Sequence, residues 1–417
     1  MTTAFTRCDG YEPDRVRQAF ASLFDLLGFD RENPLGHLVK PGDKVFIKPN
    51  WVAHQYRASC KCQDSVWSTI THPEIIRAMA EYVAKALQGH GNIRIGDNPS
   101  IDADFEKLQE LVQLEDLKSS LGVPVQILDL RPLRCADLKD YGNKHAMTVQ
   151  SGDPDGSTTI NLGRKSMLYG VNPLLFRGVF NQRMETILHH LGSRQEYNFS
   201  NSIVNADVYI SLPKLKTHHK VGTTLNLKGM VGMCGNKNYL VHWRQGFPGI
   251  GGDEYPNFRR WLRSKTEKVL NRGAWNGNDT IWRMVADLYN GFNSIRERKT
   301  FSVVDGIVGG EKEGPFCPRS KVSNTLVAGE DLLITDLVAS RLMGFQVEKM
   351  PYLNHFIETL QIDLNQIAVR SDSFDTVDFW NPRLRHLGYE PPKEWSNLIE
   401  TEQELLENRP HVGIGAN

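Results

Sequence analysis

A strand, a helix and a second strand follow one another between residues 41 and 98, and this order limits the possible folds more than any other feature. Residues 45–47 (VFI) form an apolar run after a Pro-Gly turn, and residues 93–95 (IRI) form a second short strand pattern. Between them, apolar residues recur with helical period from about Thr71 to Leu87. Two strands joined in this way form a βαβ unit, in which the strands are parallel.

Similar patterns recur along the chain. Further strands are expected at residues 125–130, 208–212, 301–306 and 324–329, and further helices at about 102–121, at two places within 258–300, and at 331–342. Thr71 and Glu74 have the spacing of a capping box, which predicts that the first helix begins after Thr71. The chain is therefore predicted to be an α/β protein, with a mostly parallel sheet, helices on both faces, and insertions between βαβ units.

The length of 417 residues suits two domains or one large α/β domain with insertions. We divide the chain into an N-terminal α/β part (1–150), an irregular insertion (151–205), a second α/β part with a loop rich in lysine and histidine (206–350), and a C-terminal extension (351–417). Ligands of open parallel sheets bind at the carboxyl ends of the strands. Residues that follow strands are therefore the first candidates for a functional site.

The charge balance argues against large charged partners. Lys and Arg together number 49, as do Asp and Glu, so no overall field draws the chain to nucleic acid or to a membrane surface. The N-terminus lacks a signal-peptide core, and no apolar run reaches the ~18 residues of a membrane span. We expect a cytoplasmic protein with a small-molecule partner, and the sequence leaves its oligomeric state open.

The six cysteines are scattered, without a disulfide-dense spacing, and are expected to be reduced. Cys60 and Cys62 form the one close pair, which could supply two metal ligands. An iron–sulfur cluster needs about four thiolates. The sequence therefore argues against an iron–sulfur cluster and leaves the role of this pair open.

The stretch from Leu212 to Pro256 contains five lysines, three histidines and eight glycines. Lys214, Lys216 and His218 directly follow an expected strand, and no acidic residue is close in sequence to neutralise them. Lysine suits phosphate or carboxylate oxygens, and glycines let backbone N–H groups approach the same anion. The stretch therefore predicts an anion site in a strand-end loop, and the alternative is a loop whose lysines point into solvent.

Residues 224–228 are predicted to form a strand, because Thr224, Asn226 and Lys228 alternate with leucines and would share one polar face. The residues proposed to transfer protons are Lys216, His218, His242 and Lys228. Those proposed to bind substrate are Lys48, Asn50, Lys214, Thr224, Asn226, Lys237 and Arg244. Those proposed as ligands of a divalent metal are Asp97, Asp253, Glu254 and Asp305. A structural role, as a hydrogen-bonded histidine or a capping carboxylate, is the alternative for each histidine and each strand-end aspartate.

The motifs together resemble the family named domain of unknown function 362, over about residues 40 to 350. They are KPN at Lys48, THPE at Thr71, IGD at Ile95, LPKLKTH at Leu212, TLNLKGMVG at Thr224, KNYLVH at Lys237, DGIVGGEKEGP at Asp305 and LITDLVASRLMGF at Leu333. Many members of that family carry ferredoxin-like cysteine clusters, and this chain has no CxxCxxC run. The segment from Lys237 to Pro256 resembles a subgroup associated with biosynthesis of surface polysaccharides or secondary metabolites.

Three functions follow as hypotheses. The first is an enzyme for a phosphorylated, carboxylated or nucleotide-linked substrate, such as a sugar derivative. It would act by lysine and histidine acid–base chemistry with divalent-metal assistance, as an isomerase, an epimerase or a group-transfer enzyme. The alternatives are a redox protein that holds an iron–sulfur centre or another metal, and an anion-binding protein without catalysis.

Overall fold

The structure, a computed structural model, describes residues 1–57, 60, 64–135, 147–178, 182–266, 272–384 and 386–399. Its strands are β1 (Thr2–Arg7), β2 (Lys44–Pro49), β3 (Asn92–Asp97), β4 (Val125–Asp129), β5 (Leu133–Cys135), β6 (Met147–Val149), β7 (Ser157–Asn161), β8 (Phe176–Arg177), β9 (Glu196–Ser200), β10 (Val208–Leu212), β11 (Lys214–His218), β12 (Gly222–Thr223), β13 (Trp243–Arg244), β14 (Lys299–Glu313), β15 (Cys317–Gly329) and β16 (Ala368–Ser371). Its α-helices are α1 (Pro13–Leu27), α2 (Pro73–Leu87), α3 (Phe105–Val112), α4 (Leu117–Ser120), α5 (Arg183–Leu188), α6 (Asn201–Val204), α7 (Leu225–Gly229), α8 (Phe258–Arg263), α9 (Asp279–Ile295), α10 (Leu332–Leu342) and α11 (Pro351–Thr359).

One large sheet organises the molecule. Within the described ranges it has ten strands, in the order β16-β1-β15-β14-β10-β2-β3-β4, with β11 beside β14 and β12 beside β11. The pairs from β14 through β10, β2 and β3 to β4 are all parallel, while β15 runs antiparallel to both β14 and β1. The prediction of an α/β fold with a mostly parallel sheet is confirmed. Strands from both predicted α/β parts lie in this sheet.

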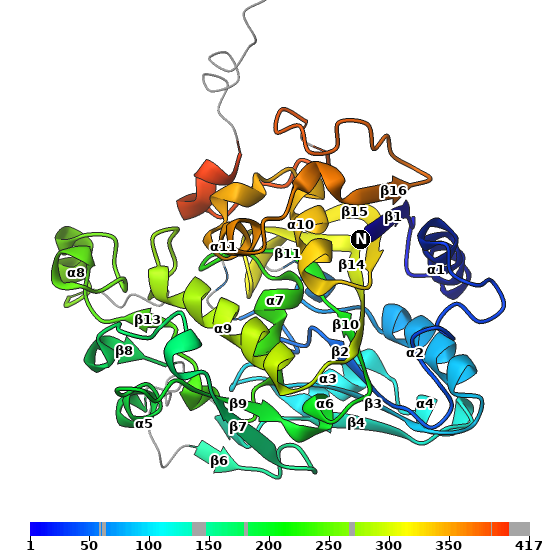
Figure 1. Ribbon diagram of the computed structural model, residues 1–417, viewed down its shortest axis with the longest axis horizontal. Coiled ribbons are helices and arrows are strands. Elements are labelled where there is room, and N and C mark those ends of the chain that lie inside the picture. Colours follow the sequence, from blue (N-terminus) through cyan, green and yellow to red (C-terminus); the bar gives the residue numbers. More distant parts are fainter. Residues whose placement is uncertain are drawn as a thin grey trace, which may run out of the picture.

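Helices cover both faces of the sheet (Figure 1) because the strand residues alternate between two cores. Val45 and Ile47 of β2 pack into the core that contains the apolar faces of α1 and α2. Phe46, between them in sequence, packs into the other core with residues of α9 and α10.

Thr71 does not cap α2, so the predicted capping box is wrong. The N-cap is His72, whose Nδ1 accepts the N–H of Glu74 at 3.2 Å. Thr71 Oγ1 instead accepts the N–H of Asn50 at 2.9 Å and donates to the carbonyl of Leu212 at 2.6 Å. The hydroxyl is used to join the ends of β2 and β10. The helix expected at 102–121 is likewise two short helices, α3 and α4.

The basic stretch begins as a strand, although a loop was expected there. Leu212 of β10 pairs with Pro49, the last residue of β2, and Pro213 then separates β10 from β11. β11 continues beside β14, with Lys214 opposite Asp305. β14 is long enough to pair with both strands, and this supplies the hydrogen-bonding partners that a loop would lack.

Residues 224–228 are helical, so the strand predicted for them is wrong. The backbone N–H groups of Asn226 and Leu227, at the start of α7, donate to the carboxylate of Asp336 on α10 at 2.8 and 2.9 Å. Leu225 and Leu227 are both fully buried in the core. A carboxylate from a helix distant in sequence therefore stabilises a short helix that its own sequence does not specify.

Cys60 and Cys317 form a disulfide, so the expectation that all six cysteines are reduced is wrong for this pair. The bond ties the segment after β2 to the start of β15. Cys8, Cys135 and Cys234 are free and buried. Cys62, the other member of the close pair, lies outside the described residues.

Candidate functional site

Two buried lysines that follow strand ends are paired with carboxylates. Lys48 Nζ lies 2.9 Å from Asp97 Oδ1, and the same carboxylate accepts the N–H groups of Trp51 at 2.8 Å and Asn98 at 2.9 Å. Gly232 packs directly on this pair: a Cβ there would overlap Asp97 Oδ1 and lie 2.9 Å from Lys48 Nζ. The glycine is therefore needed for the loop after α7 to approach the ends of β2 and β3.

The second pair, Lys214 and Asp305, is fully buried and fully hydrogen-bonded. Lys214 Nζ donates to Asp305 Oδ2 at 2.8 Å and to the hydroxyl of Tyr11 at 3.0 Å. Tyr11 donates to Asp305 Oδ1 at 2.9 Å and stacks on the ring of His72, and the backbone N–H of His72 donates to Asp305 Oδ2 at 3.0 Å. These interactions give both charged groups a structural role in joining β11 to β14.

Two further buried lysines donate to backbone carbonyls. Lys216 Nζ donates to the carbonyl of Thr69 at 2.5 Å, and Lys237 Nζ donates to those of Asn98 at 2.6 Å and Pro99 at 2.7 Å. Carbonyl oxygens accept hydrogen bonds without cancelling the charge of the ammonium. Burial lowers the pKa of Lys216 well below its ordinary value and that of Lys237 to about 7.

Lys228 is the exception among the buried lysines. Its side chain, on the last turn of α7, is 8% exposed. Among the residues that the structure describes, no acceptor hydrogen-bonds to its Nζ and no carboxylate pairs with it. Burial, with a smaller effect of the Lys48 ammonium, lowers its pKa to about 8 against the opposing effects of Cys234 and Asp97. A buried cation without a partner costs free energy unless an anion joins it.

Six other basic side chains lie within electrostatic range of Lys228. For each, burial is the main cause of a lowered pKa, and the Lys228 ammonium is a further cause; they are Lys216, His218, His219, Lys220, Lys237 and His242. We call these seven residues the Lys228 cluster. Lys220 is partly exposed, lies with Nζ 4.6 Å from the centre of the Trp243 ring, and has a pKa of about 7.

Two histidines of the Lys228 cluster present complementary nitrogens. His218 Nδ1 accepts the N–H of Lys220 at 3.0 Å, so the neutral ring carries its proton on Nε2. His242 Nδ1 lies 3.2 Å from the carbonyl of Leu240, so its proton is on Nδ1 and its Nε2 is an acceptor. Burial lowers the pKa of both rings well below the ordinary value. Within the described residues neither Nε2 atom has a partner, so one ring can donate a proton and the other can accept one.

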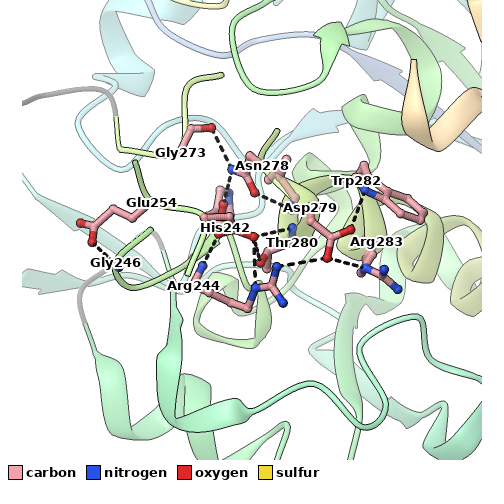
Figure 2. A network of polar contacts seen from close by, with 12 residues as sticks. His242, Arg244, Gly246, Glu254, Gly273, Asn278, Asp279, Thr280, Trp282 and Arg283 are labelled. Carbon is pink, nitrogen blue, oxygen red and sulfur yellow. Dashed lines mark hydrogen bonds and ion pairs between the residues drawn. The ribbon is translucent and has the colours of Figure 1, made fainter. Parts of the chain in front are cut away.

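Arg244, Asp253 and Glu254 belong to a second polar network, which reaches the Lys228 cluster at the backbone carbonyl of His242; Figure 2 shows this network with Arg244, Glu254 and His242 labelled. Asp253 accepts from Arg244 N at 2.6 Å and from the backbone N–H and hydroxyl of Thr280 at 2.9 and 2.5 Å. Arg244 also pairs with Asp279 at 3.2 Å, and Glu254 accepts the N–H of Gly246 at 3.1 Å. The network connects β13 to the start of α9. Its charged groups are occupied with one another, although Asp253 and Glu254 also act electrostatically on Lys220.

The remaining predicted substrate-binding residues differ in whether their polar side-chain atoms have hydrogen-bond partners. The side chain of Asn226 accepts from Ser302 Oγ at 2.9 Å and donates to Leu332 O at 3.4 Å, so it is structural. Thr224 is buried beside β11, where its N–H donates to the carbonyl of Lys216 at 3.0 Å. Asn50 makes its hydrogen bonds through the backbone to Thr71, and within the described chain its amide side chain has no partner.

The structure therefore separates the candidate residues into two sets. Six of the candidates interact electrostatically with Lys228: Lys48, Asp97, Lys216, His218, Lys237 and His242. Lys214, Asp305, Asn226, Arg244, Asp253 and Glu254 are engaged in structural contacts. Sequence reasoning placed His219 in the basic run but gave it no role, and it missed Lys220, which continues the same run. The absence of nearby acidic residues in that run was the signal that could have found them.

The four carboxylates proposed as metal ligands do not form one group. Asp97 and Asp305 each pair with a lysine, and Asp253 pairs with Arg244. In the described part of the chain, no three His, Cys, Asp or Glu side chains come together in a group that would hold a metal ion. Across the same residues, no helix is both long and apolar enough to cross a bilayer.

The structure is that of an α/β protein with a buried basic cluster within electrostatic range of Lys48 and Asp97, at the ends of two parallel strands. Residues 142–341 match the family model described as Domain of unknown function (DUF362). The family resemblance expected from the motifs is thus confirmed for residues 142–341, a shorter range than the expected 40 to 350. The matched segment contains the whole Lys228 cluster, whereas Lys48 and Asp97 lie before it.

Two similar proteins give further context. The thylakoid-associated protein sll1697 of Synechocystis sp. is 22% identical over 350 residues, which cover 84% of this chain and 77% of that protein. A crystal structure of a Thermotoga maritima protein aligns with a TM-score of 0.36 and 9% identity. That alignment covers 75% of this chain and 55% of the other.

Proposed function

We propose that the protein is an enzyme that binds a small anionic substrate at the Lys228 cluster and transfers protons with histidine and lysine side chains. The observation that carries the proposal is the buried ammonium of Lys228, which has no partner within the described chain and has six basic side chains around it. A phosphate or carboxylate group of the substrate would supply the missing negative charge. Phosphorylated, carboxylated and nucleotide-linked compounds, including sugar derivatives, all carry such a group.

The arrangement of nitrogens supports proton transfer rather than binding alone. His218 offers a proton on Nε2 and His242 offers a lone pair on Nε2. Lys220 and Lys237, each with a pKa of about 7, are half protonated near neutral pH. Groups with pKa values near the operating pH are the most effective general acids and bases. Proton transfer at a carbon beside a carbonyl, as in an isomerase or epimerase, and group transfer to a hydroxyl or amine both use such groups.

Calorimetric titration with pyrophosphate tests the binding step, and proton NMR in D₂O tests catalysis through exchange of carbon-bound hydrogen in phosphorylated and carboxylated sugars. Lys228→Met is expected to weaken pyrophosphate binding by about tenfold to a hundredfold, the value of a charged hydrogen bond. Lys85→Met, an exposed lysine of α2, is the matched control and should bind as the unaltered protein does. Equal affinity of both variants would contradict the proposal. An anion that binds and is returned unchanged, without exchange, would favour a non-catalytic anion-binding protein.

A further inference from the structure

We infer that the Lys228 amine is a nucleophile that forms an imine with an aldehyde or ketone group of the anionic substrate. This inference deepens the proposed function of the Lys228 cluster and rests on it, since it names the substrate class as anionic carbonyl compounds. The anion would be held by the neighbouring ammonium groups. The carbonyl carbon would then lie against Nζ of Lys228.

The hydrogen bonds of the buried lysines single out Lys228. Lys48 is held by Asp97, Lys216 by the carbonyl of Thr69, and Lys237 by two carbonyls. Each of those amines is therefore hydrogen-bonded to an acceptor of the protein. Lys228 alone among these four has no such acceptor in the described chain, and it is more than nine-tenths buried. Lys220 also lacks an acceptor for its Nζ within the described residues, but it is partly exposed and lies over the Trp243 ring, so Lys228 is the more deeply buried of the two amines that are free to approach a substrate atom.

The surroundings of Lys228 favour the neutral amine, which is the form that attacks a carbonyl. Burial and the Lys48 ammonium oppose its protonation and hold its pKa at about 8. An ordinary lysine has a pKa near 10.4, so at pH 7.5 the neutral fraction of Lys228 is about a hundredfold larger. The position and the protonation state of Lys228 thus point to the same residue.

The reaction is balanced without an external reagent. The amine lone pair of Lys228 forms a C–N bond as the carbonyl π bond opens, and a proton passes from nitrogen to oxygen to give a carbinolamine. The second N–H proton and the hydroxyl group then leave as one water molecule, and the C=N bond forms. The lone pair on His242 Nε2 can take the proton from nitrogen and pass it to the departing hydroxyl, and the Nε2–H of neutral His218 can donate a hydrogen bond to that hydroxyl. The imine would then acidify the neighbouring C–H bonds, as isomerase or epimerase chemistry requires.

The test uses pyridoxal 5′-phosphate, an anionic aldehyde, followed by borohydride reduction and peptide mapping by mass spectrometry. Pyridoxal without its phosphate is the matched control. The expected result is one dominant labelled lysine, Lys228, with labelling blocked by excess pyrophosphate and at least about tenfold weaker with pyridoxal, which lacks the charge-assisted contacts. Lys228→Arg should still bind pyrophosphate, because its charge is kept, and should lose this label.

Two outcomes separate the inference from the proposed function. In the first outcome, the unaltered protein binds pyrophosphate and Lys228→Met does not, but borohydride fixes the probe at another lysine or at none. This outcome overturns the imine and leaves the anion site standing. If pyrophosphate does not bind the unaltered protein, the proposed function and the imine are both overturned. Equal labelling of unaltered protein and Lys228→Arg would also reject the imine, whatever the affinity for pyrophosphate.

Discussion

Lys214 and Lys228 lie in the same basic stretch and are both buried, at 0% and 8% exposed, yet their surroundings are opposite. Lys214 meets a carboxylate at 2.8 Å and a tyrosine hydroxyl at 3.0 Å. Lys228 meets no acceptor among the described residues and is surrounded by other basic groups. Burial therefore does not separate structural from functional lysines here. The presence or absence of a protein partner does.

The largest effect is expected when Lys214 is made to resemble Lys228. Asp305→Asn removes the carboxylate and leaves a buried ammonium without its counter-charge. This change is expected to lower the free energy of unfolding by ~3–5 kcal/mol, the usual cost of breaking a buried pair from one side. Urea denaturation measures it. The matched change Lys228→Met removes an unpartnered charge and should leave stability equal or higher, and a loss as large as that of Asp305→Asn would show that Lys228 has a structural partner.

The disulfide is expected to contribute the next largest effect. Cys317 begins β15 just after Pro315, whose carbonyl oxygen lies 3.4 Å from Lys216 Nζ. The disulfide therefore holds a segment that contacts a lysine of the Lys228 cluster. Replacing Cys60 and Cys317 by serine is expected to cost ~2–4 kcal/mol, because the bond closes a long loop in the unfolded chain. Thermal denaturation with and without dithiothreitol measures it. The reductant should lower the melting temperature of the unaltered protein and leave the double-serine variant unchanged, and equal responses would refute the bond.

Gly232 offers a smaller and more local change. Gly232→Ala places a methyl group against Asp97 and Lys48, and is expected to cost ~1–3 kcal/mol as overpacking. Because it displaces the Lys48–Asp97 pair beside Lys228, it should also weaken pyrophosphate binding. Gly229→Ala, on α7, is the control, since a Cβ there meets no atom within 4 Å. Similar losses of stability in both variants would contradict the close packing of Gly232 on the pair.

The same comparison explains which parts of the structure could be predicted from the sequence. The parallel sheet and its two helical layers were predictable because strand and helix periodicities are local and repeated. The pairing of Lys214 with Asp305, 91 residues away, was not, and a lysine without acidic neighbours in sequence therefore resembled a free one. α7 was missed because five residues are too short to show a helical period, and Asp336 caps it from 110 residues away.

The candidate site was predictable in part for the same reason. Lys216, His218 and His242 were recognised as a basic group because no acid lies close to them in sequence, and the fold adds none in contact with them. The pairing of Arg244 with Asp253 was not predicted, because a turn between β13 and α8 that the sequence pattern does not specify brings the two side chains together. Local charge imbalance thus identifies candidates, and only long-range pairing removes the structural ones.

The smallest expected effect, and the most specific, is a pair of pH dependences with opposite sign. Lys228, with a pKa of about 8, and Lys220 and Lys237, with pKa values of about 7, all release protons at lower pH than in the unfolded chain, where lysine has a pKa of 10.5. Below pH 7 both states are protonated and the buried charge destabilises the fold. Between about pH 7 and 10 the unfolded chain holds more protons, so these groups make stability rise with pH. Anion binding needs the ammonium forms and should weaken over the same interval.

Thermal denaturation of unaltered protein and Lys228→Met from pH 6 to pH 9, each with and without pyrophosphate, isolates the contribution of Lys228. Without the anion, Lys228→Met should melt higher than the unaltered protein at pH 6, and the difference should shrink by pH 9 as the native amine becomes neutral. With pyrophosphate, the stabilisation of the unaltered protein should be largest at pH 6 and should fall towards pH 9. A difference between the two proteins that does not change with pH would mean that Lys228 keeps its proton throughout, as a lysine with a protein partner would, and the contrast with Lys214 would fail.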